Sequence, residues 1–154
     1  MPVRNILFLC YYNMCLSPLA EGLMNKILKE KNLQANIDSA GFEAYHINES
    51  PDKRAVKKGL EMGFDISGKK VRLFSRADLK NFDRIYVMDT HAYRMAMDFT
   101  KTDSEKDKID FLMNVIHPGK NESMPDPFYS KLDAGDVAFK ILNEACRKIA
   151  ETIE

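Results

Sequence analysis

The chain has 154 residues, of which 45% are hydrophobic and 30% are charged, and its 23 basic residues balance 23 acidic ones. This length suits one domain with a substantial core. A formal charge of zero argues against nucleic acids and membrane surfaces as partners, since both attract strongly basic proteins. The apolar run Ile6–Cys10 is too short for a secretion signal or a spanning helix, so we expect a cytoplasmic protein.

Four short runs with continuous hydrophobicity are predicted to be strands. They lie at Ile6–Leu9, Ala35–Asp38, Ile85–Met88 and Phe111–Ile116. Continuous rather than alternating hydrophobicity is typical of strands that are buried on both faces, as in a parallel sheet.

Two helices between these strands have recognisable starts. The first is predicted to begin with Ser17 as its N-cap and Pro18 at its first helical position. The pair Ser50 and Pro51 repeats this start, and the helix that follows is predicted to end at Gly63.

Two further helices complete the pattern. One follows Asp89, and the other begins near Asp133 and carries an apolar stripe from Val137 to Ile149. The polar segment 100–108 is predicted to be an exposed connection. Strands that alternate with helices predict one doubly wound, parallel α/β domain over residues 1–154, with ligands at the carboxyl ends of the strands.

The loop after the first predicted strand carries the chemistry. Cys10 stands at the carboxyl end of that strand, where backbone amides and a helix start stabilise a thiolate or an anion. Ser17 can hydrogen-bond the sulfur, and Asn13 suits a left-handed loop position. A plain structural interpretation also stays open, in which Cys10 only ends the strand and Ser17 only caps the helix.

The cysteines and histidines indicate neither a disulfide framework nor a metal site. Cys146 falls on the apolar stripe of the last helix and is predicted to be core, whereas Cys10 and Cys15 share the loop. The histidines have no paired spacing, so no metal and no cofactor are expected. They are His46, His91 and His117.

The loop and four later motifs resemble the low molecular weight protein-tyrosine-phosphatase family. The segment Cys10–Pro18, continued by Leu-Ala-Glu, resembles the family pattern Cys-x-Gly-Asn-x-Cys-Arg-Ser-Pro. The other matches are Asp38–Gly41 (Asp-Ser-Ala-Gly), Pro51–Ala55 (Pro-Asp-x-Arg-Ala), Met88–Asp89 and Pro125–Tyr129 (resembling Asp-Pro-Tyr-Tyr). The resemblance covers essentially the whole chain and implies a flavodoxin-like, three-layer fold.

The resemblance also implies a metal-free, two-step phosphoryl transfer. Cys10 would attack the phosphorus of a phosphotyrosine protein or a small aryl phosphate and form a cysteinyl-phosphate. Asp126, stiffened by a proline on each side, would protonate the leaving phenolate and then activate water.

Further site residues follow from the same resemblance. The phosphate-binding loop would consist of Tyr11, Tyr12, Asn13, Met14, Cys15 and Leu16, and a phosphate or sulfate ion is its expected small occupant. Tyr45, Phe128 and Tyr129 would form the pocket walls, although each is also compatible with an ordinary aromatic role.

Three positions depart from the family pattern. Leu16 stands at the arginine position, Tyr12 at the glycine position, and Lys69 where many members carry a histidine. An arginine donates two hydrogen bonds to the phosphate, each worth roughly 1.5 to 3 kcal/mol, so its loss costs about 3 to 6 kcal/mol. We therefore expect turnover that is weaker by about a hundred- to ten-thousandfold.

Three interpretations stay open at this point. The chain is a phosphatase whose natural or engineered loop has lost most turnover, a non-catalytic binding relative, or a redox switch. The redox switch would use the Cys10–Cys15 pair that the resemblance implies. An arsenate reductase would need a further reactive cysteine, and Cys146 is predicted to be buried. Arg54, Lys69, Lys70 and Arg72 could replace the missing cation only by analogy, and the oligomeric state is left open.

Overall fold

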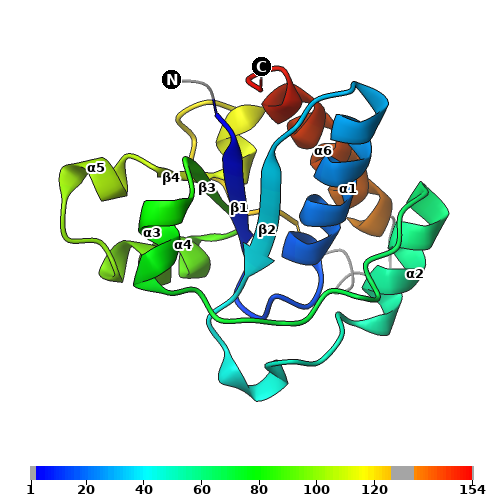
Figure 1. The fold of residues 1–154 in the computed structure, drawn as a ribbon, viewed down its shortest axis with the longest axis horizontal. Helices are drawn as coiled ribbons and strands as arrows, with labels where there is room; N and C mark the ends of the chain where they lie inside the picture. The colour runs from blue at the N-terminus through cyan, green and yellow to red at the C-terminus, as the bar shows by residue number, and fades with distance from the viewer. Residues whose placement is uncertain (1–2, 126–133, 154) are drawn as a thin grey trace.

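A parallel sheet forms the middle layer of the computed structural model, which describes residues 3–125 and 134–153 and, at 134–136, the backbone alone. Its strands are β1 (Asn5–Leu9), β2 (Asn36–Ala40), β3 (Arg84–Val87) and β4 (Ile109–Phe111). All pairs are parallel, and the strand order in this described part is β2-β1-β3-β4 (Figure 1). The predicted doubly wound α/β sheet is therefore confirmed.

Helices cover both faces of this sheet. Figure 1 shows α1 and α6 on one side of the strands and α3, α4 and α5 on the other. The helices are α1 (Leu16–Glu30), α2 (Lys53–Met62), α3 (Arg76–Asn81), α4 (Thr90–Asp98), α5 (Asp103–Lys106) and α6 (Ala134–Ala150), with 3-10 turns η1 (Ala44–His46) and η2 (Leu112–Val115). Within residues 3–125 and 134–153, no helix has the length and apolarity needed to cross a membrane.

The alternation of side chains along β1 divides the core into two halves. Ile6 and Phe8 are fully buried against α1 and α6, whereas Leu7 and Leu9 are fully buried against α3 and α4. Burial on both faces explains why the sequence reads as a continuous apolar run. Cys146 lies in the α1–α6 half with an exposed fraction of 0%, as predicted.

Two predicted helix starts are wrong. Helix α1 begins at Leu16 with Cys15 as its N-cap residue, because the Ser17 hydroxyl is occupied by partners in the loop. Helix α2 begins at Lys53 rather than at Ser50–Pro51, because the Asp52 carboxylate caps it by accepting from the Arg54 N–H. Both helices keep their predicted identity, and α2 ends at the predicted left-handed Gly63.

The fourth strand and two short helices also differ from the prediction. Strand β4 covers Ile109–Phe111 instead of Phe111–Ile116, since residues 112–115 turn into η2. The segment 100–108 is mostly exposed but includes α5. Helix α3 was missed, although its capping pair, Ser75 and Asp78, is the kind of signal that marks a helix start.

Candidate active site

The loop that carries Cys10 lies at the carboxyl ends of β1, β2 and β3. Its position is fixed by backbone hydrogen bonds, since the Cys10 N–H donates to Ala40 O at 3.4 Å and the Phe42 N–H donates to Tyr11 O at 2.7 Å. The order in which strands are added to the sheet reverses between β1 and β3, and such a switch point is where open α/β sheets bind ligands. The loop therefore occupies the position that the sequence predicts.

Gly41 allows the loop to approach the end of β2. A Cβ atom there would lie 2.8 Å from both Asn13 N and Tyr11 O, and 2.9 Å from Tyr12 C. All of these contacts are with backbone, which cannot swing away as a flexible side chain does. A glycine at this position is therefore a condition for the observed loop.

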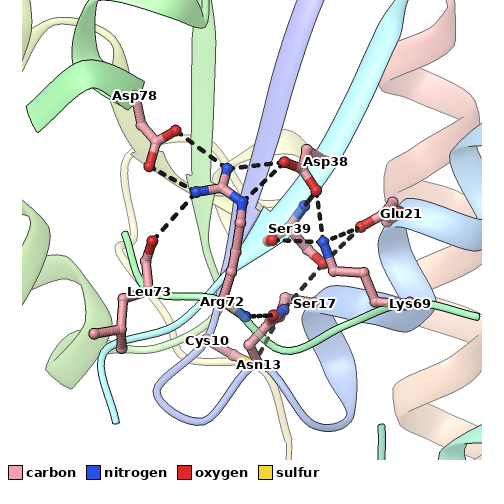
Figure 2. A network of polar contacts seen from close by, with 10 residues as sticks. All are labelled: Cys10, Asn13, Ser17, Glu21, Asp38, Ser39, Lys69, Arg72, Leu73 and Asp78. Carbon is pink, nitrogen blue, oxygen red and sulfur yellow. Dashed lines mark hydrogen bonds and ion pairs between the residues drawn. The ribbon is translucent and has the colours of Figure 1, made fainter. Parts of the chain in front are cut away.

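A buried hydrogen-bond network lies beneath the thiol, as Figure 2 shows. Cys10 Sγ is 2.9 Å from Ser17 Oγ, and Asn13 Nδ2 donates to Ser17 Oγ at 2.9 Å and to Ser39 Oγ at 3.0 Å. Because the Ser17 oxygen accepts from Asn13, its proton is available to the sulfur. Asn13 has the predicted left-handed backbone, with φ of 58°. Both Asn13 and Ser17 are fully buried.

Lys69 joins this network to a layer of ion-paired side chains beneath the loop. Its ammonium contacts Asp38 Oδ1, donates to Ser39 O at 2.8 Å and lies 3.0 Å from Glu21 Oε1. Ser39 Oγ in turn donates to Glu21 Oε1 at 2.7 Å. The lysine therefore fixes the same serine that receives a hydrogen bond from Asn13.

Arg72 extends the layer to α3. Its guanidinium donates to Asp38 Oδ2 at 2.9 Å and to both Asp78 oxygens at 3.0 and 3.1 Å, and its backbone N–H donates to Asn13 Oδ1 (Figure 2). Burial alone would raise the pKa of Asp38, but the hydrogen bond and charge of Lys69, with the charge of Arg72, lower it. Burial alone would lower the pKa of Arg72, but the hydrogen bonds and charges of Asp78 and Asp38 outweigh burial and raise it.

A cavity of about 230 Å³ opens beside Cys10. Its described lining residues are Cys10, Tyr11, Tyr12, Met14, Cys15, Leu16, Met88, Asp89 and Met124. Leu16 thus forms part of the wall at the position where the family pattern has arginine. No lysine or arginine belongs to this described lining, and Asp89 is its one carboxylate. A larger hollow of about 640 Å³ lies beyond Glu21 and Lys69, and Cys10 does not line it.

The cations that the sequence offered as substitutes are held elsewhere. Lys69 and Arg72 lie beneath the loop in the ion pairs just described. Arg54 pairs with Asp52 at 2.9 Å, and Lys70 lines the larger hollow. Within the described residues, none of the four lines the cavity at Cys10.

Aromatic rings form the rim of this cavity. Tyr11 stacks on His91 with ring centres 4.3 Å apart, and Tyr12 meets Tyr11 edge-on at 4.8 Å. Tyr12 is 51% exposed and is not among the described residues with positive φ, so the loop takes a tyrosine here without the left-handed backbone that glycine permits. Tyr45 does not line the cavity. This residue is 83% exposed, and its ring lies against His46.

Three further site residues were predicted from the motif Pro125–Tyr129. Asp126, Phe128 and Tyr129 lie outside the described residues, so their roles stay predictions. Sequence reasoning missed Met124 as a lining residue, and used Met88 and Asp89 only as a motif. In the described part of the chain, no three His, Cys, Asp or Glu side chains converge on a point where a metal could bind.

A thiol held by a buried serine at the switch point of a parallel sheet defines an α/β protein with a cysteine at its ligand-binding edge. Comparison with known proteins gives the family. The family model described as low molecular weight phosphotyrosine protein phosphatase matches residues 5–154, so the chain belongs to this family, as its motifs predicted.

Individual relatives agree with this assignment. The low molecular weight phosphotyrosine protein phosphatase of Schizosaccharomyces pombe is 30% identical over 142 residues, which cover 90% of each chain. The crystal structure of a protein tyrosine phosphatase from Entamoeba histolytica has a TM-score of 0.85 at 31% identity, and the match covers 96% of this chain and 95% of that one. Bacillus subtilis YfkJ is similar with a TM-score of 0.82 at 25% identity, covering 99% and 95%.

Proposed function

We propose that this chain is a protein-tyrosine-phosphatase of the low molecular weight type whose turnover is strongly weakened by Leu16. Its substrates would be phosphotyrosine proteins or small aryl phosphates. The 2.9 Å contact between Cys10 Sγ and Ser17 Oγ carries this proposal, because a buried hydroxyl aimed at sulfur stabilises a thiolate nucleophile. The Schizosaccharomyces pombe relative, which is named a phosphotyrosine protein phosphatase, supports the substrate class.

The proposed reaction has two steps. Cys10 Sγ attacks phosphorus, so that an S–P bond forms while the P–O bond to the phenolate breaks, and Asp126 protonates the departing oxygen. Water then attacks phosphorus and gives a proton to Asp126, and the sulfur leaves as a thiolate that Ser17 stabilises. The role of Asp126 rests on its sequence motif, because this residue lies outside the described part.

The weakness of turnover follows from the cavity wall. Charge builds on the phosphate oxygens in the transition state, and a guanidinium would donate two hydrogen bonds to them. Leu16 donates none. Lys69 and Arg72 do not replace the missing arginine, because their charges pair with Asp38 and its neighbours beneath the loop. The resulting loss is about 3 to 6 kcal/mol of transition-state stabilisation.

Restoring the arginine tests this proposal. We expect Leu16→Arg to raise kcat/KM for p-nitrophenyl phosphate and a phosphotyrosine peptide by about a hundred- to ten-thousandfold. Adding Tyr12→Gly should raise it further if the Tyr12 ring restricts entry. Leu60→Arg is a matched control, because Leu60 is 59% exposed on α2 and should leave turnover unchanged.

Cys10→Ser is the final control for this experiment. It must abolish the turnover gained by Leu16→Arg, because the serine hydroxyl is a far weaker nucleophile than a thiolate. If neither restored variant gains activity over the starting chain, the chain is not a weakened phosphatase.

A non-catalytic binding role is the second candidate, and the apolar cavity wall favours it. Such a protein would bind a phosphotyrosine peptide or a less polar ligand without turnover. Equilibrium binding of matched phosphorylated and unphosphorylated peptides, with hydrolysis followed in the same samples, separates the candidates, since a non-catalytic protein binds a peptide and leaves its phosphate in place.

A thiol switch is the third candidate, because Cys10 and Cys15 line the same cavity. A thiol switch requires that peroxide oxidises the Cys10 and Cys15 thiols together.

A further inference from the structure

Most of the described residues that line the cavity at Cys10 carry sulfur. Of its nine described lining residues, the five that carry sulfur are Cys10, Met14, Cys15, Met88 and Met124. The whole chain has only 3 cysteines and 9 methionines among 154 residues. More than half of the lining residues thus come from fewer than a tenth of the chain, so residues with soft sulfur atoms are concentrated around the cavity.

The described side chains of the cavity would not repel a metal cation. Its described lining contains no lysine or arginine, and its one carboxylate, Asp89, accepts a hydrogen bond from the Ala92 N–H. A guanidinium at position 16 would repel a metal ion, and Leu16 does not. Thiolates and thioethers are the ligands that cuprous ion prefers in proteins, whereas carboxylates and water suit hard ions.

The loop also places both cysteines beside groups that favour negative charge. Cys15 is the N-cap residue of α1, and Cys10 Sγ lies against the Ser17 hydroxyl. The positive end of a helix favours negative charge at its first turn. Two thiolates with one monovalent ion carry a net charge of −1, which this end of α1 stabilises.

We propose that this cavity binds a single cuprous ion, Cu(I), through the thiolates of Cys10 and Cys15 and a thioether of Met14 or Met124. Each thiol releases its proton to solvent as its Cu–S bond forms, and copper stays cuprous, so no electron is transferred. The absence of three converging His, Cys, Asp or Glu side chains in the described residues argues against zinc here, because thioethers are poor zinc ligands. The site shares Cys10 with the proposed phosphatase reaction, so bound copper would block that reaction, but copper binding does not require turnover.

The test is an anaerobic titration of the reduced protein with Cu(I) supplied as its bicinchoninate complex, whose colour reports the copper that the protein removes. We expect one Cu(I) per chain. Each of Cys10→Ser and Cys15→Ser should weaken binding at least about a hundredfold, and Met14→Leu with Met124→Leu about tenfold. Cys146→Ala and Met95→Leu are matched controls outside the cavity and should leave the affinity unchanged.

Several outcomes would overturn the site. These are undiminished affinity in the Cys10→Ser, Cys15→Ser double variant, no loss in the double methionine variant, an equal loss in a control, or displacement of the copper by equimolar Zn²⁺. X-ray absorption at the copper edge of the unaltered protein needs no variant to fold, and nitrogen or oxygen ligands there would refute the proposal.

Leu16→Arg separates this site from the proposed function. The variant should bind Cu(I) more weakly while it hydrolyses aryl phosphates faster. Failure of hydrolysis alone contradicts the phosphatase proposal, and failure of copper binding alone contradicts the copper site.

Discussion

The two sides of the Cys10 loop differ in how closely they follow the family pattern. On the inner side, Asn13 and Ser17 keep the pattern, are fully buried and have polar partners. In the described residues, no buried side-chain nitrogen or oxygen lacks a hydrogen bond. On the outer side, Tyr12 and Leu16 depart from the pattern and face the cavity. The shape of the loop is therefore maintained by one side, while the chemistry presented to a ligand is decided by the other.

Thiol reactivity should give the largest contrast between the cavity and the interior. Cys10 and Cys15 line the cavity, whereas Cys146 is fully buried, and burial raises the pKa of the Cys146 thiol. Since Cys146 reacts only when the fold opens, we expect iodoacetamide to modify it at least about a thousandfold more slowly than the loop cysteines. Peptide mass spectrometry over time measures this ratio, and comparable rates would show that the cavity is closed to reagents.

Asn13→Ala should break the inner side of the loop. The change removes two donated hydrogen bonds and one accepted from the Arg72 N–H, and places alanine at φ of 58°. We expect a loss of about 3 to 5 kcal/mol in the free energy of unfolding. Urea denaturation measures it.

Asn48→Ala isolates the backbone cost of that change. Asn48 has φ of 69° but is exposed and makes no side-chain hydrogen bond among the described residues, so its replacement should cost only about 1 kcal/mol. Equal losses in the two variants would mean that the network beneath the thiol contributes nothing to stability.

Strands β1, β2 and β3, the α/β alternation and the inner side of the loop could be predicted because local rules decide them. A buried strand leaves a continuous apolar run, and asparagine tolerates left-handed backbone whatever its surroundings. The start of α1 could not be predicted in the same way. Ser17 has the residue type of an N-cap, but its hydroxyl is taken by Cys10 and Asn13, which is a tertiary effect.

Contacts between distant segments also could not be predicted from the sequence. Lys69 and Arg72 were considered as replacements for the missing cation, and only the fold places their charges on Asp38 beneath the loop. Met14 and Met124 come from segments 110 residues apart and meet at one cavity. The expectation of no metal was based on cysteine number and histidine spacing and did not count methionine. The expected catalytic role of Asp126 stays a prediction.

Gly41→Ala tests how tightly the loop is held against β2. The added Cβ would lie 2.8 Å from Asn13 N and Tyr11 O, so backbone has to move. We expect a loss of about 1 to 3 kcal/mol in unfolding free energy, typical of overpacking. Gly68→Ala is the matched control, because nothing lies within 4 Å of its Cβ position. If both variants retain full stability, the loop is free to shift away from Gly41.

Acidification should have the smallest effect on stability, a slight weakening of the charged layer beneath the loop. The pKa of Asp38 is lowered from its ordinary value of 3.8, because Lys69 and Arg72 outweigh the opposing effect of burial. A carboxylate with a lowered folded-state pKa stabilises the fold above its unfolded-state pKa, and this contribution is lost as pH falls through the folded-state value.

Asp38→Asn should therefore be less stable than the parent at pH 7, and this difference should shrink as the pH falls below about 4. Since the carboxylate is partly exposed, solvent screening keeps the difference below about 1 kcal/mol. Lys69 retains Glu21 and the Ser39 carbonyl in this variant, so the loop itself should persist. Urea denaturation at pH 7 and at a pH below about 4 measures the difference in unfolding free energy. A constant difference would mean that Asp38 stabilises this layer through packing rather than through its charge.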